Sequence, residues 1–165
     1  MARFQRFIIL AASLVFLPRL AMAQLRISLG AGGGLAGLTE STLSDGRGAP
    51  VVMGQITKSV VPFLGIGVEV DDWIHGSSNV AFATAHVQLH VPATFLYVKL
   101  GAGYGTGDPA GLGSTSGAAI QIGAAYDLTV PLAPIAATVF ANGFVSHAAA
   151  ASIQMVDLGL ALTWR

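Results

Sequence analysis

The 165-residue chain contains no cysteine and few charged residues. Without cysteine it can form neither a disulfide framework nor a thiolate metal site, and it has no thiol nucleophile. Lys, Arg, Asp and Glu make up only 10% of the sequence, and their formal charges cancel at neutral pH. A balanced and weakly charged chain lacks the basic surface that nucleic acids require, so we expect no nucleic-acid partner.

Beyond its N-terminal region the sequence also lacks a long hydrophobic run, although apolar residues make up 53% of it. A membrane-spanning helix needs about 20 consecutive apolar residues. The most apolar candidate, 128–141, is interrupted by Pro131 and Pro134. A chain this apolar without such a helix is either a sheet that faces lipid or an unusually apolar soluble β-protein.

The first 23 residues have the organisation of a secretory signal peptide. Arg3 and Arg6 precede an apolar run over 7–16 that is too short to span a membrane, and Ala21-Met22-Ala23 is a small-x-small cleavage site. An uncleaved anchor helix is disfavoured because Pro18 interrupts the run. We expect cleavage after Ala23, which leaves 24–165 as one exported domain.

From residue 24 onward, apolar residues alternate with small or polar ones at a period of two, which is typical of β-strands. In the last segment Leu158, Leu160 and Leu162 fall on one face, while Gly159 and Ala161 fall on the other. We predict eight strands, at 24–36, 50–60, 62–71, 79–91, 94–105, 116–128, 134–146 and 152–164. The segment 134–146 is ambiguous, because its phenylalanines share a face with Thr, Asn and Ser, and the direction in which it faces stays open.

The composition of the two faces indicates which one meets lipid. One face is aliphatic, whereas the other consists mainly of Gly, Ala, Ser and Thr, with too few charges to solvate a protein surface. Small residues suit the interior of an eight-stranded barrel, whose lumen is just filled by side chains. Tyr126 and Trp164 near one end of the aliphatic face, and Tyr104 near the other, are placed as aromatic girdles would be. The pattern therefore predicts an all-β fold, an eight-stranded antiparallel up-and-down transmembrane β-barrel.

The predicted connections alternate in length. Short turns fall at 59–62, 90–94 and 128–134, and longer links at 37–50, 72–78 and 106–115, with a short plain link at 147–151. Short turns at one end and longer loops at the other are the outer-membrane arrangement, in which both termini are periplasmic.

The chain resembles the small eight-stranded outer-membrane proteins of the OmpA and OmpX type over essentially all of 24–165. The most specific match is the C-terminal assembly signal of that superfamily, at Asp157, Gly159, Leu162 and Trp164, although Arg165 follows where the family usually ends on the aromatic residue. The resemblance implies a location in the bacterial outer membrane, among its lipid and lipopolysaccharide. It also implies recognition by periplasmic chaperones and by the outer-membrane assembly machinery.

Candidate chemistry lies on the polar face. Seven ionisable residues are predicted to form a lumen network, which either fills the barrel as paired groups or acts as an ion path or gate: Arg26, Glu69, Asp71, His86, Lys99, Asp127 and Asp157. His86 and His90 share a face, but four residues along a strand separate them by about 13 Å, so they cannot bind one metal ion. We therefore predict no catalytic residues, no cofactor and no metal site.

We predict a small, non-enzymatic outer-membrane barrel with a side-chain-filled lumen, extracellular loops and a structural or surface-interaction role, and three alternatives stay open. Some barrels of this size modify lipid A through a Ser–His pair, but Ser146 and His147 are neighbours on a predicted strand and would point to opposite faces. A loop-mediated adhesin or receptor would use its long loops, yet 37–50 lacks aromatic anchors, and Trp73 belongs either to a loop or to the outer girdle. An exported soluble β-protein would require the aliphatic faces to pack against each other. The ligand of the loops, if any, is unknown.

Overall fold

The computed structural model describes residues 25–38, 47–108, 114–129, 134–147 and 152–164. The expected signal peptide, its cleavage site, 39–46 and 109–113 within two of the predicted long links, and Arg165 lie outside these residues. Eight strands account for nearly all of the described chain: β1 (Leu25–Leu38), β2 (Arg47–Val61), β3 (Leu64–His75), β4 (Ser78–His90), β5 (Leu96–Gly107), β6 (Thr115–Thr129), β7 (Ile135–His147) and β8 (Ser152–Trp164).

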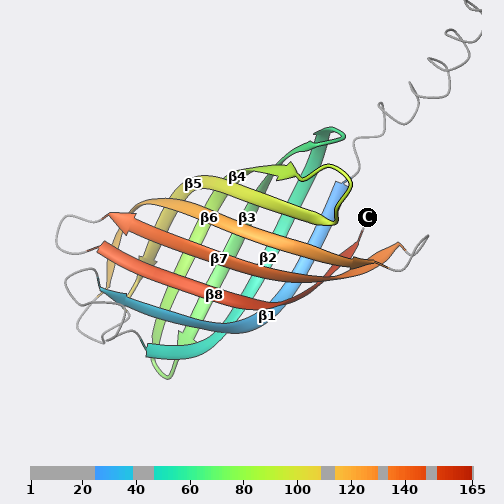
Figure 1. The fold of residues 1–165 in the computed structure, drawn as a ribbon. Helices are drawn as coiled ribbons and strands as arrows, with labels where there is room; N and C mark the ends of the chain where they lie inside the picture. Colours follow the sequence, from blue (N-terminus) through green and yellow to red (C-terminus); the bar gives the residue numbers. More distant parts are fainter. Residues whose placement is uncertain (1–24, 39–46, 109–113, 130–133, 148–151, 165) are drawn as a thin grey trace, which may run out of the picture.

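The strands form a single closed barrel in chain order, and every neighbouring pair is antiparallel (Figure 1). The barrel closes where β8 returns to β1, with Ile27 opposite Trp164 and Leu38 opposite Ile153. This topology confirms the predicted eight-stranded up-and-down barrel. No helix in the described ranges is long and apolar enough to cross a membrane.

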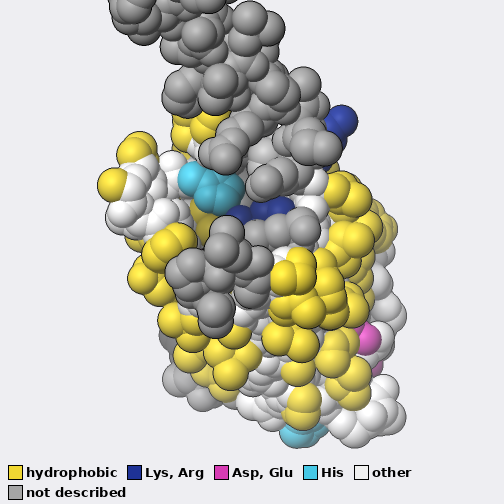
Figure 2. Space-filling model, turned by 90° about the vertical axis from the view of Figure 1, so that its right-hand side faces the viewer, with side chains coloured by type: hydrophobic (Ala, Val, Ile, Leu, Met, Phe, Trp, Pro, Cys, Tyr) yellow, Lys and Arg dark blue, Asp and Glu magenta, His cyan; other side chains and the backbone are white. Residues whose placement is uncertain are grey.

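Burial alternates along each strand with the period that the sequence predicts. In β8, Leu158 and Leu160 are 61% and 62% exposed, whereas Asp157 and Ala161 on either side of them are buried. Around the rest of the barrel most large aliphatic side chains also point outward, and the inward positions carry polar or small residues together with a smaller set of large apolar ones such as Phe82 and Phe140. Hydrophobic side chains consequently cover much of the barrel flank (Figure 2). The aliphatic faces do not pack against each other, which argues against the soluble β-protein.

One predicted connection is wrong. The link at 72–78 is not a long loop, because β3 continues to His75 and pairs it directly with Ser78 at the start of β4. Only Gly76 and Ser77 remain in the turn, and Gly76 has a φ of +62°. A two-residue hairpin turn requires such left-handed geometry, and glycine adopts it without steric cost.

The orientation of β7, which the sequence left open, is also settled by the structure. Phe140 and Phe144 both point into the barrel and are fully buried. Glycines on neighbouring strands make room for the first ring: a Cβ on Gly30 or Gly159 would lie within 2.9 Å of a Phe140 ring carbon. Packing across strands, and not the pattern within β7, decides which way the strand faces.

Candidate functional site: the lumen

The lumen is blocked by apolar side chains at the end of the barrel opposite the termini. This apolar plug consists of Ala36, Val51, Trp73, Val80, Phe82, Ala119, Phe144, Ile153 and Met155. The rings of Phe82 and Phe144 stack at 4.7 Å between centroids, and Trp73 donates a hydrogen bond to the carbonyl oxygen of Gly34 at 3.2 Å. The interpretation of Trp73 as a loop or girdle residue is therefore wrong, since its side chain is completely buried inside the barrel.

A buried ion pair lies deeper in the lumen, between β3 and β5. Lys99 Nζ donates to Glu69 Oε2 at 2.5 Å, and both side chains are inaccessible to solvent. The second carboxylate oxygen, Glu69 Oε1, accepts from Gln121 Nε2 at 2.7 Å. Thr84 in turn donates to Gln121 Oε1 at 2.6 Å. Side chains from β5 and β6 thus bond both oxygens of the Glu69 carboxylate, and Thr84 of β4 bonds Gln121 in turn, which is the partnering that a charge in a dry interior requires.

His86 belongs to a second hydrogen-bonded group. Its Nε2 lies 3.1 Å from Gln55 Nε2 and 3.1 Å from Thr57 Oγ1. Gln55 Nε2 also donates to Gln88 Oε1 at 3.2 Å, and Gln88 Nε2 lies 2.8 Å from His90 Nε2. The group extends from the middle of the lumen toward the end at which the termini lie.

A second ion pair occupies that end. Arg26 Nη2 donates to Asp127 Oδ2 at 2.7 Å, and Thr138 donates to the other carboxylate oxygen at 2.7 Å. The guanidinium carbon of Arg26 also lies 5.2 Å from the centre of the Tyr97 ring, within the range of a cation–π contact. Thr138 lies 2.9 Å from Thr163, which continues the polar contacts across to β8.

Asp71 and Asp157 differ from the other inward charges. Both are buried, and their carboxylate oxygens lack well-formed hydrogen bonds among the described residues, although Glu69 lies near Asp71 and Asn142 lies near Asp157. Asn142 is also opposite Asp157 in the β7–β8 register. All seven predicted residues face the lumen, where they divide into two ion pairs, His86 with its amide and hydroxyl neighbours, and two carboxylates that belong to neither ion pair.

The described residues contain no group of three or more His, Asp or Glu side chains arranged to hold a metal ion. The lumen contacts instead join strands to one another. Every hydrogen-bonded group spans at least two strands, so the polar groups contribute to the closure of the barrel.

Comparison with solved structures places this geometry among known barrels. No family model matches the chain, and no curated protein matches its sequence. The structure is similar to Neisserial surface protein A, with a TM-score of 0.58 and 10% identity, over 85% of this chain and 96% of that protein. It is also similar to Ail, the attachment invasion locus protein of Yersinia pestis, solved with the heparin analogue sucrose octasulfate, with a TM-score of 0.57 and 15% identity, over 85% and 97% of the two chains.

The fold is that of a small outer-membrane barrel. These likenesses support an outer-membrane location. At this identity they establish the fold alone, and the role of the chain has to be argued from its own residues.

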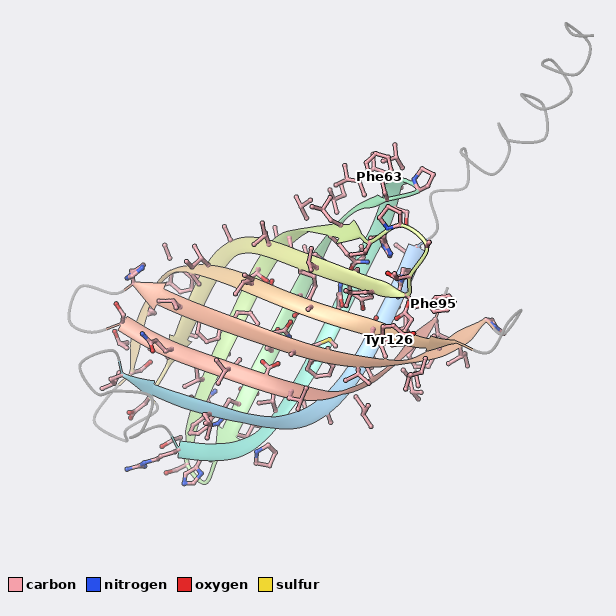
Figure 3. All side chains as sticks on the ribbon, viewed as in Figure 1. Phe63, Phe95 and Tyr126 are labelled. Carbon is pink, nitrogen blue, oxygen red and sulfur yellow. The ribbon has the colours of Figure 1, made fainter. Side chains whose placement is uncertain are left out.

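In an outer-membrane barrel the outward aromatics mark the edges of the apolar belt. Tyr126 and Trp164 point outward at the end where the termini lie, and Tyr104 points outward toward the other end, where it donates to Ser116 at 2.8 Å. The structure adds Phe63 and Phe95, which are more than half exposed (Figure 3). Phe95 contacts Tyr126 edge-on, with 6.3 Å between centroids. The sequence already carried a signal for these two girdle residues, because Phe63 and Phe95 each follow a predicted short turn directly.

The four residues of the expected assembly signal are divided between the two faces of β8. Asp157 and Gly159 face the lumen, and Leu162 and Trp164 face outward. A Cβ on Gly159 would come within 2.5 Å of the Ala31 carbonyl oxygen and 2.6 Å of the Phe140 ring, so the barrel itself requires glycine at this position. Recognition by the assembly machinery stays a prediction.

Ser146 and His147 do not form a nucleophile–base pair. Ser146 is buried, and its hydroxyl donates toward the carbonyl oxygen of Gly117 at 3.2 Å. His147 is exposed on the opposite face, where Nδ1 lies 3.1 Å from Ser152 Oγ. The pair considered for lipid A modification is therefore separated by the barrel wall.

Proposed function

We propose that the chain is a non-enzymatic structural component of the bacterial outer membrane, a barrel that closes its own lumen instead of conducting solutes. The apolar plug carries this proposal, because Trp73, Phe82 and Phe144 are at most 1% exposed. Eight-stranded barrels leave interior space that side chains just fill. The Glu69–Lys99 pair and its amide partners support the proposal by occupying the middle of the same lumen.

We further propose that both termini, and the β2–β3, β4–β5 and β6–β7 turns that share their end, lie in the periplasm. Support comes from link lengths: no link at the end of the termini exceeds five residues, whereas the β1–β2 and β5–β6 links at the opposite end span 39–46 and 108–114, and short periplasmic turns are the usual arrangement. Cleavage after Ala23 and delivery by periplasmic chaperones belong to the same proposal. The second candidate, a surface-interaction role, would have to reside in loop residues outside the described ranges.

Two measurements on protein from outer-membrane fractions test the proposal. Unboiled protein should migrate differently from boiled protein in a denaturing gel, as a closed barrel does. The same protein in planar lipid bilayers should give no stable open-channel current. As a matched pair, Trp73→Ala, which empties part of the plug, should lower the temperature at which the folded gel mobility is lost, whereas Phe63→Ala, on the outer surface, should not. Sustained current through the parent protein would overturn the closed-lumen proposal.

A further inference from the structure

A groove on the outer face of the barrel, across β2 to β5, lies outside the lumen and its network. Its floor is formed by Ala85 and Ala102, which lie directly opposite each other in the β4–β5 register. The same row continues to Val68 on β3 and Ile120 on β6, which are 55% and 58% exposed. Two short side chains between two branched ones form a depression two strands wide in an otherwise aliphatic surface.

Lys58 lines the same groove. It lies on the outward face of β2, opposite Leu25 and Ile66, near the end of the strand that adjoins the termini. The side chain is exposed, and the described residues offer it neither a hydrogen bond nor an ion pair. An ammonium on an aliphatic, lipid-facing surface is costly unless it reaches an anionic partner at the membrane interface.

A second depression on the barrel is equally apolar but, among its described lining residues, lacks the charged side chain of the first. It crosses β5 to β8 and is lined by residues such as Leu100, Ile120 and Val156, with no charged side chain among the described residues that line it. Both depressions suit an acyl chain by their apolar surface. Only the one across β2 to β5 adds a cation, and this charge selects an anionic headgroup.

We propose that the groove across β2 to β5 binds an anionic glycerophospholipid, with an acyl chain over Ala85 and Ala102 and the headgroup phosphate on Lys58. The inference rests on the proposed membrane location and orientation, which place Lys58 toward the periplasmic leaflet. This placement favours a glycerophospholipid over lipopolysaccharide, whose phosphates would lie at the far end of the barrel. Lys58 would also repel the Lys58 of a second copy seated symmetrically on the groove, which argues against a dimer contact there.

The test is a lipid titration of the full-length protein purified from outer membranes in detergent. Phosphatidylglycerol, zwitterionic phosphatidylethanolamine and lipopolysaccharide are added separately, and bound lipid is counted by native mass spectrometry. One basic side chain near a membrane surface contributes enough to change affinity about fivefold. We expect Lys58→Gln to weaken phosphatidylglycerol binding by about this factor and phosphatidylethanolamine binding by less, because the ammonium of the latter headgroup offsets the charge of its phosphate. The matched control is Arg47→Gln, which removes an exposed cation from the other end of the same strand.

A second pair of variants tests the apolar part of the groove. Ala85→Leu fills the floor and should weaken the binding of both lipids. Ala141→Leu enlarges another outward-facing alanine, opposite Ala124 and Leu158, and should have no effect. Unaltered phosphatidylglycerol binding by Lys58→Gln, an equal loss in Arg47→Gln, or tighter binding of lipopolysaccharide through Lys58 would each overturn the proposal. Failure of the proposed function is distinguishable, because the parent protein would then show no heat-dependent gel shift.

Discussion

Replacing Lys99 with methionine removes the ammonium that neutralises Glu69 but keeps most of the volume of the side chain. Both partners have 0% side-chain exposure, so the carboxylate cannot recover its lost interaction from bulk water. Removing one partner of a buried ion pair typically costs about 3–5 kcal/mol. Gln121 still donates to Glu69, so we expect Lys99→Met to cost the lower end of this range, about 3 kcal/mol in the free energy of unfolding.

The assay is urea unfolding in lipid vesicles, followed by tryptophan fluorescence and by the fraction of protein that keeps the folded gel mobility. The double variant Glu69→Gln/Lys99→Met removes both charges and should unfold within about 1 kcal/mol of the parent, because a neutral replacement leaves no unpaired ion. Lys58→Met makes the same change on the outer face, where no described partner is left behind, and should not destabilise the barrel. A Lys99→Met variant as stable as the parent, or a double variant less stable than the single one, would refute the reasoning.

Three further predictions use the same unfolding and gel-mobility assays. Leu158→Arg, at the middle of β8 on the outer face, should cost about 2–4 kcal/mol in vesicles, and Ile135→Arg, at the start of β7, about 0–1 kcal/mol; equal costs would contradict a lipid-facing exterior. Gly103→Val should abolish the folded gel band, because a Cβ there would lie 2.0 Å from the Ala83 carbonyl oxygen, whereas Gly33→Ala meets nothing within 4 Å and should fold normally. Phe144→Ala should cost about 3–5 kcal/mol by leaving a cavity in the plug, and a loss no larger than that of exposed Phe63→Ala would show that the plug does not stabilise the fold.

The sequence predicted the strand number, the antiparallel closure and the direction of most faces, because alternation within one strand determines which side chains share a side. The inward placement of Trp73 followed from the same rule but was missed. Trp73 has the parity of Glu69 and Asp71, and extending the predicted strand by two residues would have directed it into the lumen. The error in the 72–78 link and the error in Trp73 therefore have one cause, a strand that was ended too early.

Other features depend on contacts between strands and could not be read from one segment. β7 faces inward with its phenylalanines because Gly30 and Gly159, far away in sequence, leave space for Phe140. The division of the lumen charges also depends on register. The sequence placed Arg26 and Asp127 on the inward face, but only the closed barrel brings these residues, 101 positions apart, to a distance of 2.7 Å.

The lumen restricts the size of the side chains that point into it, whereas the outer surface does not restrict the size of those that point outward. Inward positions combine large rings with glycines, because a filled eight-stranded interior has room for one ring only where the neighbouring wall has no Cβ. Outward positions meet lipid, which adapts to the surface, so alanines such as Ala85 and Ala102 create a depression without any structural penalty. A hollow on the outer face is consequently not a packing defect that the fold must correct. With an exposed and unpaired Lys58 at its edge, it is a place where the surface can select among lipids without changing the barrel.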